Sequence, residues 1–187
     1  MIQPEETILH SDKIYIETPR LLLRKWKKED LLPFSEMNSD KEVMRYFPKT
    51  LTFEESEKSY NTFREEIERY DYGLFAIEVK DDHQFAGFTG FHHFNFNVSF
   101  APGIEIGWRL KSNYWNKGYA TEAAKACLEY AKKQKLFKEI YSFTATINKP
   151  SEKVMQKIGM QKTGEFDHPN VPDHHPLKKH VLYKIEL

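Results

Sequence analysis

The sequence predicts an α/β fold in which a mixed sheet carries helices on both of its faces. In the second half of the chain, candidate strands and helices alternate, which is typical of α/β layering. In the first half, two candidate strands follow one another across a tight turn and predict a meander. The 187 residues contain no repeat and no Gly/Ser-rich linker, so we expect one domain over residues 13–187 after an N-terminal tail, residues 1–12.

The N-terminal part begins with a strand and continues with helices. Branched and apolar residues predict a strand over Ile14–Arg24, which Pro19 would kink or confine to a sheet edge. Thr52 and Glu55 have the spacing of a capping box and predict a helix that runs to about Tyr70. Weaker patterns predict two short helices, over residues 28–38 and 40–46.

An amphipathic helix is the main feature of the second half. Apolar residues recur at helical spacing from about Gly118 to Gln134 and include the single cysteine, Cys127, which we therefore assign to the core. Gly159 fits the left-handed residue that ends a further helix over residues 150–158. Strands are expected over residues 73–80, 84–95, 102–111, 139–147, 160–167 and 178–186.

Composition argues against several classes of function. The 28 basic and 28 acidic side chains cancel and form no basic block, so neither nucleic acid nor an anionic membrane is expected as a partner. One cysteine cannot form an intramolecular disulfide, and no apolar run reaches the roughly twenty residues that span a bilayer. Residues 1–12 lack the apolar core of a signal peptide. We therefore expect a soluble cytoplasmic protein.

The segment Lys117–Thr121 lies between a predicted strand and a predicted helix. Backbone N–H groups at a helix N-terminus lack partners within the helix, and with the helix dipole they favour a bound diphosphate. Gly118 would let such a ligand approach the backbone closely, and Lys117, Lys111 or Lys153 would add charge. A simple turn explains the same glycine, so these residues alone leave both interpretations open.

Several short motifs occur in a fixed order along the chain. They are TPRLLLR at 18–24, GIEIGW at 103–108, WNKGYATEA at 115–123, NKPS at 148–151, KIGM at 157–160, FDHP at 166–169 and HVLY at 180–183. This order resembles the GNAT N-acyltransferase superfamily, and in particular its Rim-like branch, which includes the ribosomal-protein N-terminal acetyltransferases. The resemblance extends from about Ile14 to the C-terminus, so it is far more specific than any single motif.

The resemblance implies a GNAT-like sheet, mostly antiparallel, in which a pair of strands splays apart to admit the pantetheine arm of acetyl-CoA, the expected co-substrate. The arm would bond to the backbone near Trp108, Arg109 and Leu110, and Gly107 would form a bulge in the same strand. Asn148 would bond the pantetheine or steer the substrate. The pyrophosphate would lie on the loop formed by Lys117, Gly118, Tyr119, Ala120 and Thr121.

The implied reaction moves the acetyl group of acetyl-CoA to a primary amine by direct attack in a ternary complex. Deprotonating the amine at pH 7 costs ~1 kcal/mol for an α-amine of pKa about 8 and ~4.6 kcal/mol for a lysine amine of pKa about 10.4. Glu105 faces away from its apolar neighbours and is the candidate base, with a solvated strand carboxylate as the alternative. Ser151 would lie near the CoA sulfur, with helix capping as its alternative role. Many GNAT enzymes place a tyrosine acid at the position of Met155, which cannot donate a proton.

Two rival functions stay open. Met155 favours a catalytically weak acyl-CoA-binding module. The late histidines, from His168 to His180, would suit a metal-dependent protein, but their irregular spacing favours loop histidines and no metal. The resemblance also implies that Tyr46, Phe47, the helix after Thr52 and the late loop set acceptor specificity. The acceptor is left open between a protein N-terminus and a small amine, and the assembly between a monomer and a homodimer.

Overall fold

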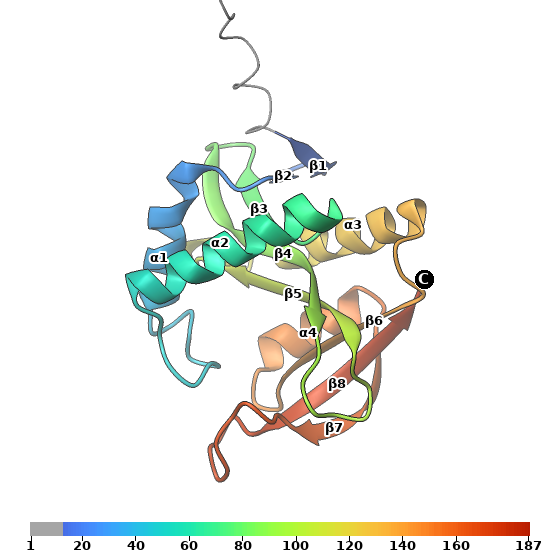
Figure 1. Cartoon of the computed structure of the whole chain (residues 1–187). Coiled ribbons are helices and arrows are strands. Elements are labelled where there is room, and N and C mark those ends of the chain that lie inside the picture. The colour runs from blue at the N-terminus through green and yellow to red at the C-terminus, as the bar shows by residue number, and fades with distance from the viewer. Residues whose placement is uncertain (1–12) are drawn as a thin grey trace, which may run out of the picture.

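The computed structural model describes residues 13–187, so the expected tail, residues 1–12, lies outside the described residues. Eight strands form one sheet in the order β1-β2-β3-β4-β5-β6-β8-β7 (Figure 1). The strands are β1 (Ile14–Glu17), β2 (Leu21–Arg24), β3 (Leu74–Val79), β4 (Gln84–Phe94), β5 (Gly103–Leu110), β6 (Glu139–Ala145), β7 (Gln161–Asp167) and β8 (Lys179–Glu186). The α-helices are α1 (Leu31–Ser39), α2 (Phe53–Tyr70), α3 (Tyr119–Gln134) and α4 (Lys149–Lys157).

The sheet is antiparallel except at its centre. β5 and β6 are parallel, and only one residue pair, Glu105 with Tyr141, is in register between them. β4, by contrast, pairs with β5 from Gly87–Leu110 to Phe94–Gly103 without interruption. The two central strands therefore separate beyond Glu105, which confirms the mixed, mostly antiparallel sheet with a splayed strand pair.

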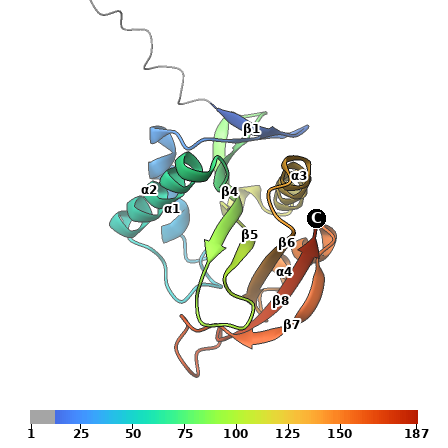
Figure 2. The ribbon, with the colours of Figure 1, turned by 45° about the vertical axis from the view of Figure 1, so that its right-hand side comes forward.

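The helices lie on both faces of the sheet, as expected (Figure 2). α1 and α2 cover one face, where the rings of Trp26, Phe34, Phe63 and Phe88 pack together. α3 packs on the other face through small residues, and its Cys127 is fully buried. Burial raises the pKa of the Cys127 thiol, which confirms a core role for this residue. None of the helices in the described part of the chain has the length and apolar character needed to span a bilayer.

Local signals predicted helix ends well. The hydroxyl of Thr52 accepts the N–H of Glu55 at 3.2 Å, and the Glu55 carboxylate accepts the N–H of Thr52 at 3.0 Å, so the capping box is confirmed. Gly159 follows α4 with a φ of +91°, a left-handed conformation that glycine adopts without a steric penalty.

Two expectations near the N-terminus are wrong. Ile14–Arg24 is not one strand but two, because the chain reverses at Thr18–Pro19–Arg20 and the N–H of Thr18 bonds to the carbonyl of Leu21 at 2.9 Å. Residues 40–46 form turns instead of a helix. The Asp40 carboxylate accepts the N–H of Glu42 at 2.8 Å, a local bond that competes with helix formation.

Candidate active site

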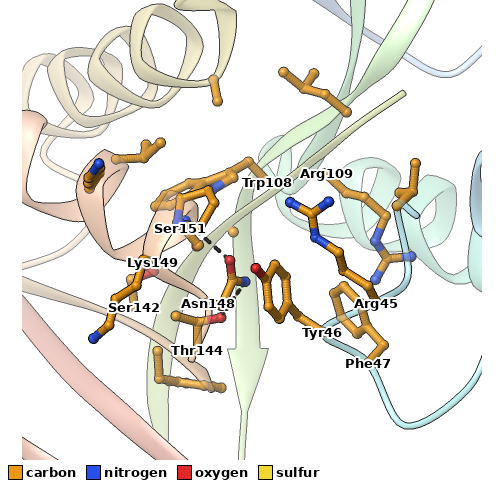
Figure 3. Close-up of a pocket in the computed structure, with 18 of the residues that line it drawn as sticks. Arg45, Tyr46, Phe47, Trp108, Arg109, Ser142, Thr144, Asn148, Lys149 and Ser151 are labelled. Atoms are coloured by element: carbon orange, nitrogen blue, oxygen red, sulfur yellow. Dashed lines mark hydrogen bonds between the residues drawn. The ribbon is translucent and has the colours of Figure 1, made fainter. Parts of the chain in front are cut away.

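A cavity of about 890 Å³ opens where β5 and β6 separate. Its wall combines β5, the N-terminus of α3, the segment from β6 into α4, and the loop between α1 and α2 (Figure 3). All but one of the expected site residues line it: Glu105, Trp108, Arg109, Leu110, Gly118, Tyr119, Ala120, Thr121, Asn148 and Ser151. The exception is Lys117. A cavity of this size suits a small-molecule site.

The N-terminus of α3 forms one end of the cavity. Gly118 is its N-cap residue with a φ of 81°, and no side chain caps the first turn. The N–H groups of the first turn therefore have no partner within the helix or from a cap, and the residues that carry them line the cavity. A Cβ on Gly118 would lie 3.4 Å from Arg20 Nη2 in a backbone conformation that side chains rarely adopt. This end of the cavity has the geometry of an anion site.

Arg20, which sequence reasoning missed, fixes this end. Its Nε donates to Glu122 Oε2 at 2.6 Å and its Nη1 donates to the carbonyl of Lys117 at 2.8 Å. The hydroxyl of Thr18 donates to Glu122 Oε1 at 2.7 Å. Burial opposes ionisation of Glu122, but the bonds from Thr18 and Arg20 prevail and lower its pKa. The one carboxylate in the first turn of α3 is thus compensated and does not repel a phosphate.

Only one of the three lysines considered for the phosphates borders the cavity. Lys117 Nζ lies 5.4 Å from the centre of the Tyr114 ring. Lys111 lines a smaller hollow beside α1. Lys153, on α4, lines the main cavity and is exposed.

Asn148 caps α4. Its Oδ1 accepts the N–H of Ser151 at 3.3 Å, and its Nδ2 donates to Thr144 Oγ1 at 2.8 Å. The capping role considered for Ser151 therefore belongs to Asn148, and the Ser151 side chain borders the cavity. Met155 is buried at 1% exposure below this surface, where it packs in the core.

Glu105 is half-buried in the cavity wall. Its cross-strand neighbour is His92 on β4, whose Nδ1 lies 3.0 Å from the carboxylate of Glu66 on α2. Burial raises the pKa of Glu105 to about 8, and the nearby His92 offsets only part of this effect. The bond to Glu66 raises the pKa of His92. This enclosure distinguishes Glu105 from a solvated strand carboxylate.

The bulge expected at Gly107 is wrong. Gly107 pairs in register with Gly90, and its carbonyl accepts the Thr89 hydroxyl at 3.0 Å. The bulge was expected because a strand that leaves its ladder at Gly107 could offer a backbone N–H to the thioester oxygen. The separation of the two central strands arises on the β6 side instead, while the β4–β5 ladder stays regular.

The loop between α1 and α2 covers the cavity on the side opposite α4. Figure 3 shows the Tyr46 hydroxyl pointing toward Asn148, with Arg45 and Phe47 beside it. The Arg45 guanidinium lies 5.0 Å from the ring centres of both Tyr46 and Trp115. Tyr46 and Phe47 therefore line the cavity, where residues that set acceptor specificity would have to lie. The loop contains no recognisable motif.

A family model described as an acetyltransferase (GNAT) domain matches residues 20–161. The chain belongs to the GNAT acetyltransferase family. It is 35% identical to a Bacillus subtilis (strain 168) protein described as uncharacterized N-acetyltransferase YnaD, over 153 residues that cover 82% of this chain and 86% of that protein. It is also similar to the crystal structure of a GNAT-family acetyltransferase from Bacillus anthracis, with a TM-score of 0.77, 31% identity, and coverage of 91% and 97%.

A more distant structure agrees on the fold. RimL, described as a ribosomal L7/L12 alpha-N-protein acetyltransferase in complex with coenzyme A, has a TM-score of 0.77 at 14% identity, with coverage of 94% and 98%. The chain is thus an acyltransferase of the GNAT family, and acetyl transfer is its general activity.

The residues of this GNAT acetyltransferase fit acetyl-CoA as co-substrate. The uncapped first turn of α3 offers N–H groups to a diphosphate. Beyond Glu105, β5 has no registered partner on the β6 side, so its backbone near Trp108 is open to an extended arm, while the carbonyl of Leu110 accepts the indole N–H of Trp115 at 2.9 Å. Acetyl-CoA supplies the activated acetyl group.

The late histidines lie at the rim of the cavity. The rings of His168 and His180 are 4.8 Å apart, and burial lowers the pKa of His168 to about 4, so it is neutral at pH 7. Within residues 13–187, no group of three or more His, Cys, Asp or Glu side chains is placed to hold a metal ion. The metal-dependent rival therefore has no geometric support there.

Proposed function

We propose that this GNAT acetyltransferase transfers the acetyl group of acetyl-CoA to a primary amine, either a small amine or a protein N-terminus, by direct attack in a ternary complex. The observation that supports this most directly is Glu105. Its carboxyl group borders the cavity, and its raised pKa, about 8, suits a general base near neutral pH. We propose further that residues 13–187 form a single acetyltransferase domain.

In this proposal the two sides of the cavity have different tasks. The first turn of α3, with Lys153 nearby, binds the phosphates, and the open backbone of β5 binds the pantetheine arm. The acceptor enters from the side of the α1–α2 loop. Glu105 accepts a proton from the amine while its nitrogen forms a bond to the thioester carbon and the carbon–sulfur bond breaks.

The departing CoA thiolate needs a proton. Met155 is buried and has no proton to give, so the tyrosine acid of many GNAT enzymes has no equivalent at this position. We propose the Ser151 hydroxyl as the donor, taking a proton from water as it gives its own to the thiolate, because it borders the cavity beside Asn148 and does not serve as the helix cap.

Met155 also supports a second candidate, a catalytically weak acyl-CoA-binding module. One experiment separates the two. Purified protein is incubated with acetyl-CoA and a panel of α-amines, lysine-type amines and peptides, with thiol release measured by absorbance and products measured by mass spectrometry. Amine-dependent thiol release with an acetylated product supports the enzyme. Tight CoA binding by calorimetry without any product would leave only the binding module.

A further inference from the structure

An arginine with no anionic partner lies in the cavity wall on the side away from α4. Arg109 extends from β5, and its guanidinium lies 4.2 Å from the centre of the Phe47 ring and 5.3 Å from that of Phe88. Its Nη1 donates to Asn38 Oδ1 at 2.7 Å, whereas its Nε is buried without a hydrogen-bond partner. Burial lowers the pKa of Arg109 to about 10, so the side chain is still cationic at neutral pH.

Arg24, which is 4% exposed, shows what a structural role looks like. Arg24 donates from Nη1 to Asp30 at 2.7 Å and from Nε to Glu78 at 2.6 Å, so two carboxylates balance its charge. Within residues 13–187, no carboxylate forms an ion pair with Arg109. Arg109 is half-buried, and partial withdrawal of an uncompensated charge from water is costly, so an apolar residue would suit this position better if packing were its only role.

Asn38 orients Arg109 without neutralising it. Asn38 is fully buried on α1, and its Nδ2 donates to Ser56 Oγ on α2 at 3.2 Å, which leaves Oδ1 as the acceptor for Arg109. A carboxylate at this position would fix the guanidinium equally well but would cancel its charge. The arrangement holds a cation in place and keeps it available to a ligand.

Arg109 and Glu105 share one face of β5, four residues apart, with Gly107 between them. A Cβ at Gly107 would meet only Glu105 Oε1, at 3.9 Å, so no side chain obstructs the floor between the two charged groups. Their Cα atoms are roughly 13 Å apart at about 3.3 Å per strand residue. Each side chain extends into the cavity and shortens the span that a ligand must bridge.

We propose that Arg109 binds an anionic group of the acceptor, a carboxylate or a phosphate, while the amine at the other end of the same molecule reaches Glu105. The acceptor class is then a small amine with an acidic end, such as an amino-acid derivative or a short peptide. This inference rests on the proposed acetyl transfer. It adds the chemistry of the acceptor, because a planar guanidinium recognises both carboxylate and phosphate oxygens.

Binding measured without turnover tests the proposal. The protein is saturated with CoA, which carries no acetyl group, and titrated by calorimetry with glycine peptides of two to four residues as free acids and as C-terminal amides. At about 3.5 Å per residue, the series measures the amine-to-anion distance. We expect the free acid to bind about tenfold tighter than the amide at the best length, as for a hydrogen bond to a charged group. 6-Aminohexyl phosphate against 6-aminohexanoate, with 6-aminohexanol as the neutral reference, shows whether phosphate is preferred to carboxylate.

Two variants test whether Arg109 is the source of the preference. Arg109→Met should remove the preference for the acid, and Asn38→Asp should reduce it by supplying a competing carboxylate. Arg69→Met, at an exposed arginine of α2, is the matched control and should keep the preference. Should Arg109→Met fail to fold, Asn38→Asp still decides.

The outcomes separate this inference from the proposed function. Equal affinities of acid and amide for the wild type, or no binding of either, overturn the inference, as does an undiminished preference in both Arg109→Met and Asn38→Asp. Acetylation of neutral amines with no preference for acids leaves the proposed function intact. A clear preference for acids with no acetylated product for any amine overturns the proposed function alone.

Discussion

Replacing Glu105 with glutamine should make the protein more stable at high pH and less active. Burial raises the pKa of this carboxyl to about 8 from an ordinary 4.5, so the folded protein resists its ionisation. A group whose pKa is higher in the folded than in the unfolded protein contributes stability that is fully present below the unfolded pKa. For Glu105 this means below pH 4.5. That contribution is lost as the pH rises to about 8. Glutamine has nearly the same shape and no charge, so it avoids this loss.

The magnitude follows from the two pKa values. Each pKa unit is worth about 1.4 kcal/mol, so the wild type would lose about 4 kcal/mol relative to Glu105→Gln between pH 5 and pH 9. Glu105 borders a cavity, and water there relaxes part of the desolvation penalty. We therefore expect a relative gain of about 2 kcal/mol for Glu105→Gln over this pH range. His92 also titrates near this site, but both proteins contain it, so most of its effect cancels.

Urea denaturation at pH 5, 7 and 9 measures the free energy of unfolding of the wild type, of Glu105→Gln and of the control Glu129→Gln at an exposed site on α3. The stability difference should grow with pH for Glu105→Gln and stay near zero for Glu129→Gln. The same preparations should show a wild-type kcat/KM that rises through about pH 8 and a lower rate without that inflection in Glu105→Gln. A stability difference that is independent of pH would refute the reasoning about burial.

Three further predictions concern the same cavity. Gly118→Val should raise the KM for acetyl-CoA about tenfold and leave the acceptor KM unchanged, because a left-handed backbone disfavours a side chain beside the anion site; an unchanged KM would contradict the role of α3. Ser151→Ala should lower kcat about tenfold or more if the Ser151 hydroxyl protonates the thiolate. If Tyr46→Phe lowers kcat more than Ser151→Ala does, Tyr46 is the proton donor instead. His92→Gln should shift the rising limb of the kcat/KM profile to higher pH by about half a unit, because His92 lowers the pKa of Glu105; an identical profile would show that the two groups do not interact.

The sequence predicted the elements that depend on near neighbours. The bonds between Thr52 and Glu55 span three residues, and the apolar face of α3 repeats within one helix, so both are visible as patterns. The turn between β1 and β2 and the loop over residues 40–46 combine local hydrogen bonds with contacts from distant parts of the chain. Ser112, for example, donates to Asp40 at 3.3 Å across 72 positions. No local pattern reports such a contact.

The same limit separates the two parts of the site. The anion site was visible because a helix N-terminus with a glycine is a local feature, and motif order then identified its family. The sequence did not show which side chains pair with the charged residues of the site. Arg20 and Glu122 are 102 positions apart, and Asn38 and Arg109 are 71 apart. Which charges meet is decided by the packing of helices on the sheet, not by spacing along the chain.

The burial of Glu105 links the stability of the protein to its proposed chemistry. Proton transfer from an α-ammonium of pKa about 8 to a carboxylate with a pKa of about 8 is close to thermoneutral, whereas transfer from a lysine of pKa about 10.4 costs ~3 kcal/mol. An exposed glutamate with a pKa of about 4.3 would make the same transfers cost ~5 and ~8 kcal/mol. The enclosed position therefore matches the base to an α-amine. Burial of Glu105 both strengthens it as a base and destabilises its ionised form. A substitution that lets water reach Glu105 should therefore reduce the stability lost at high pH and also weaken Glu105 as a base.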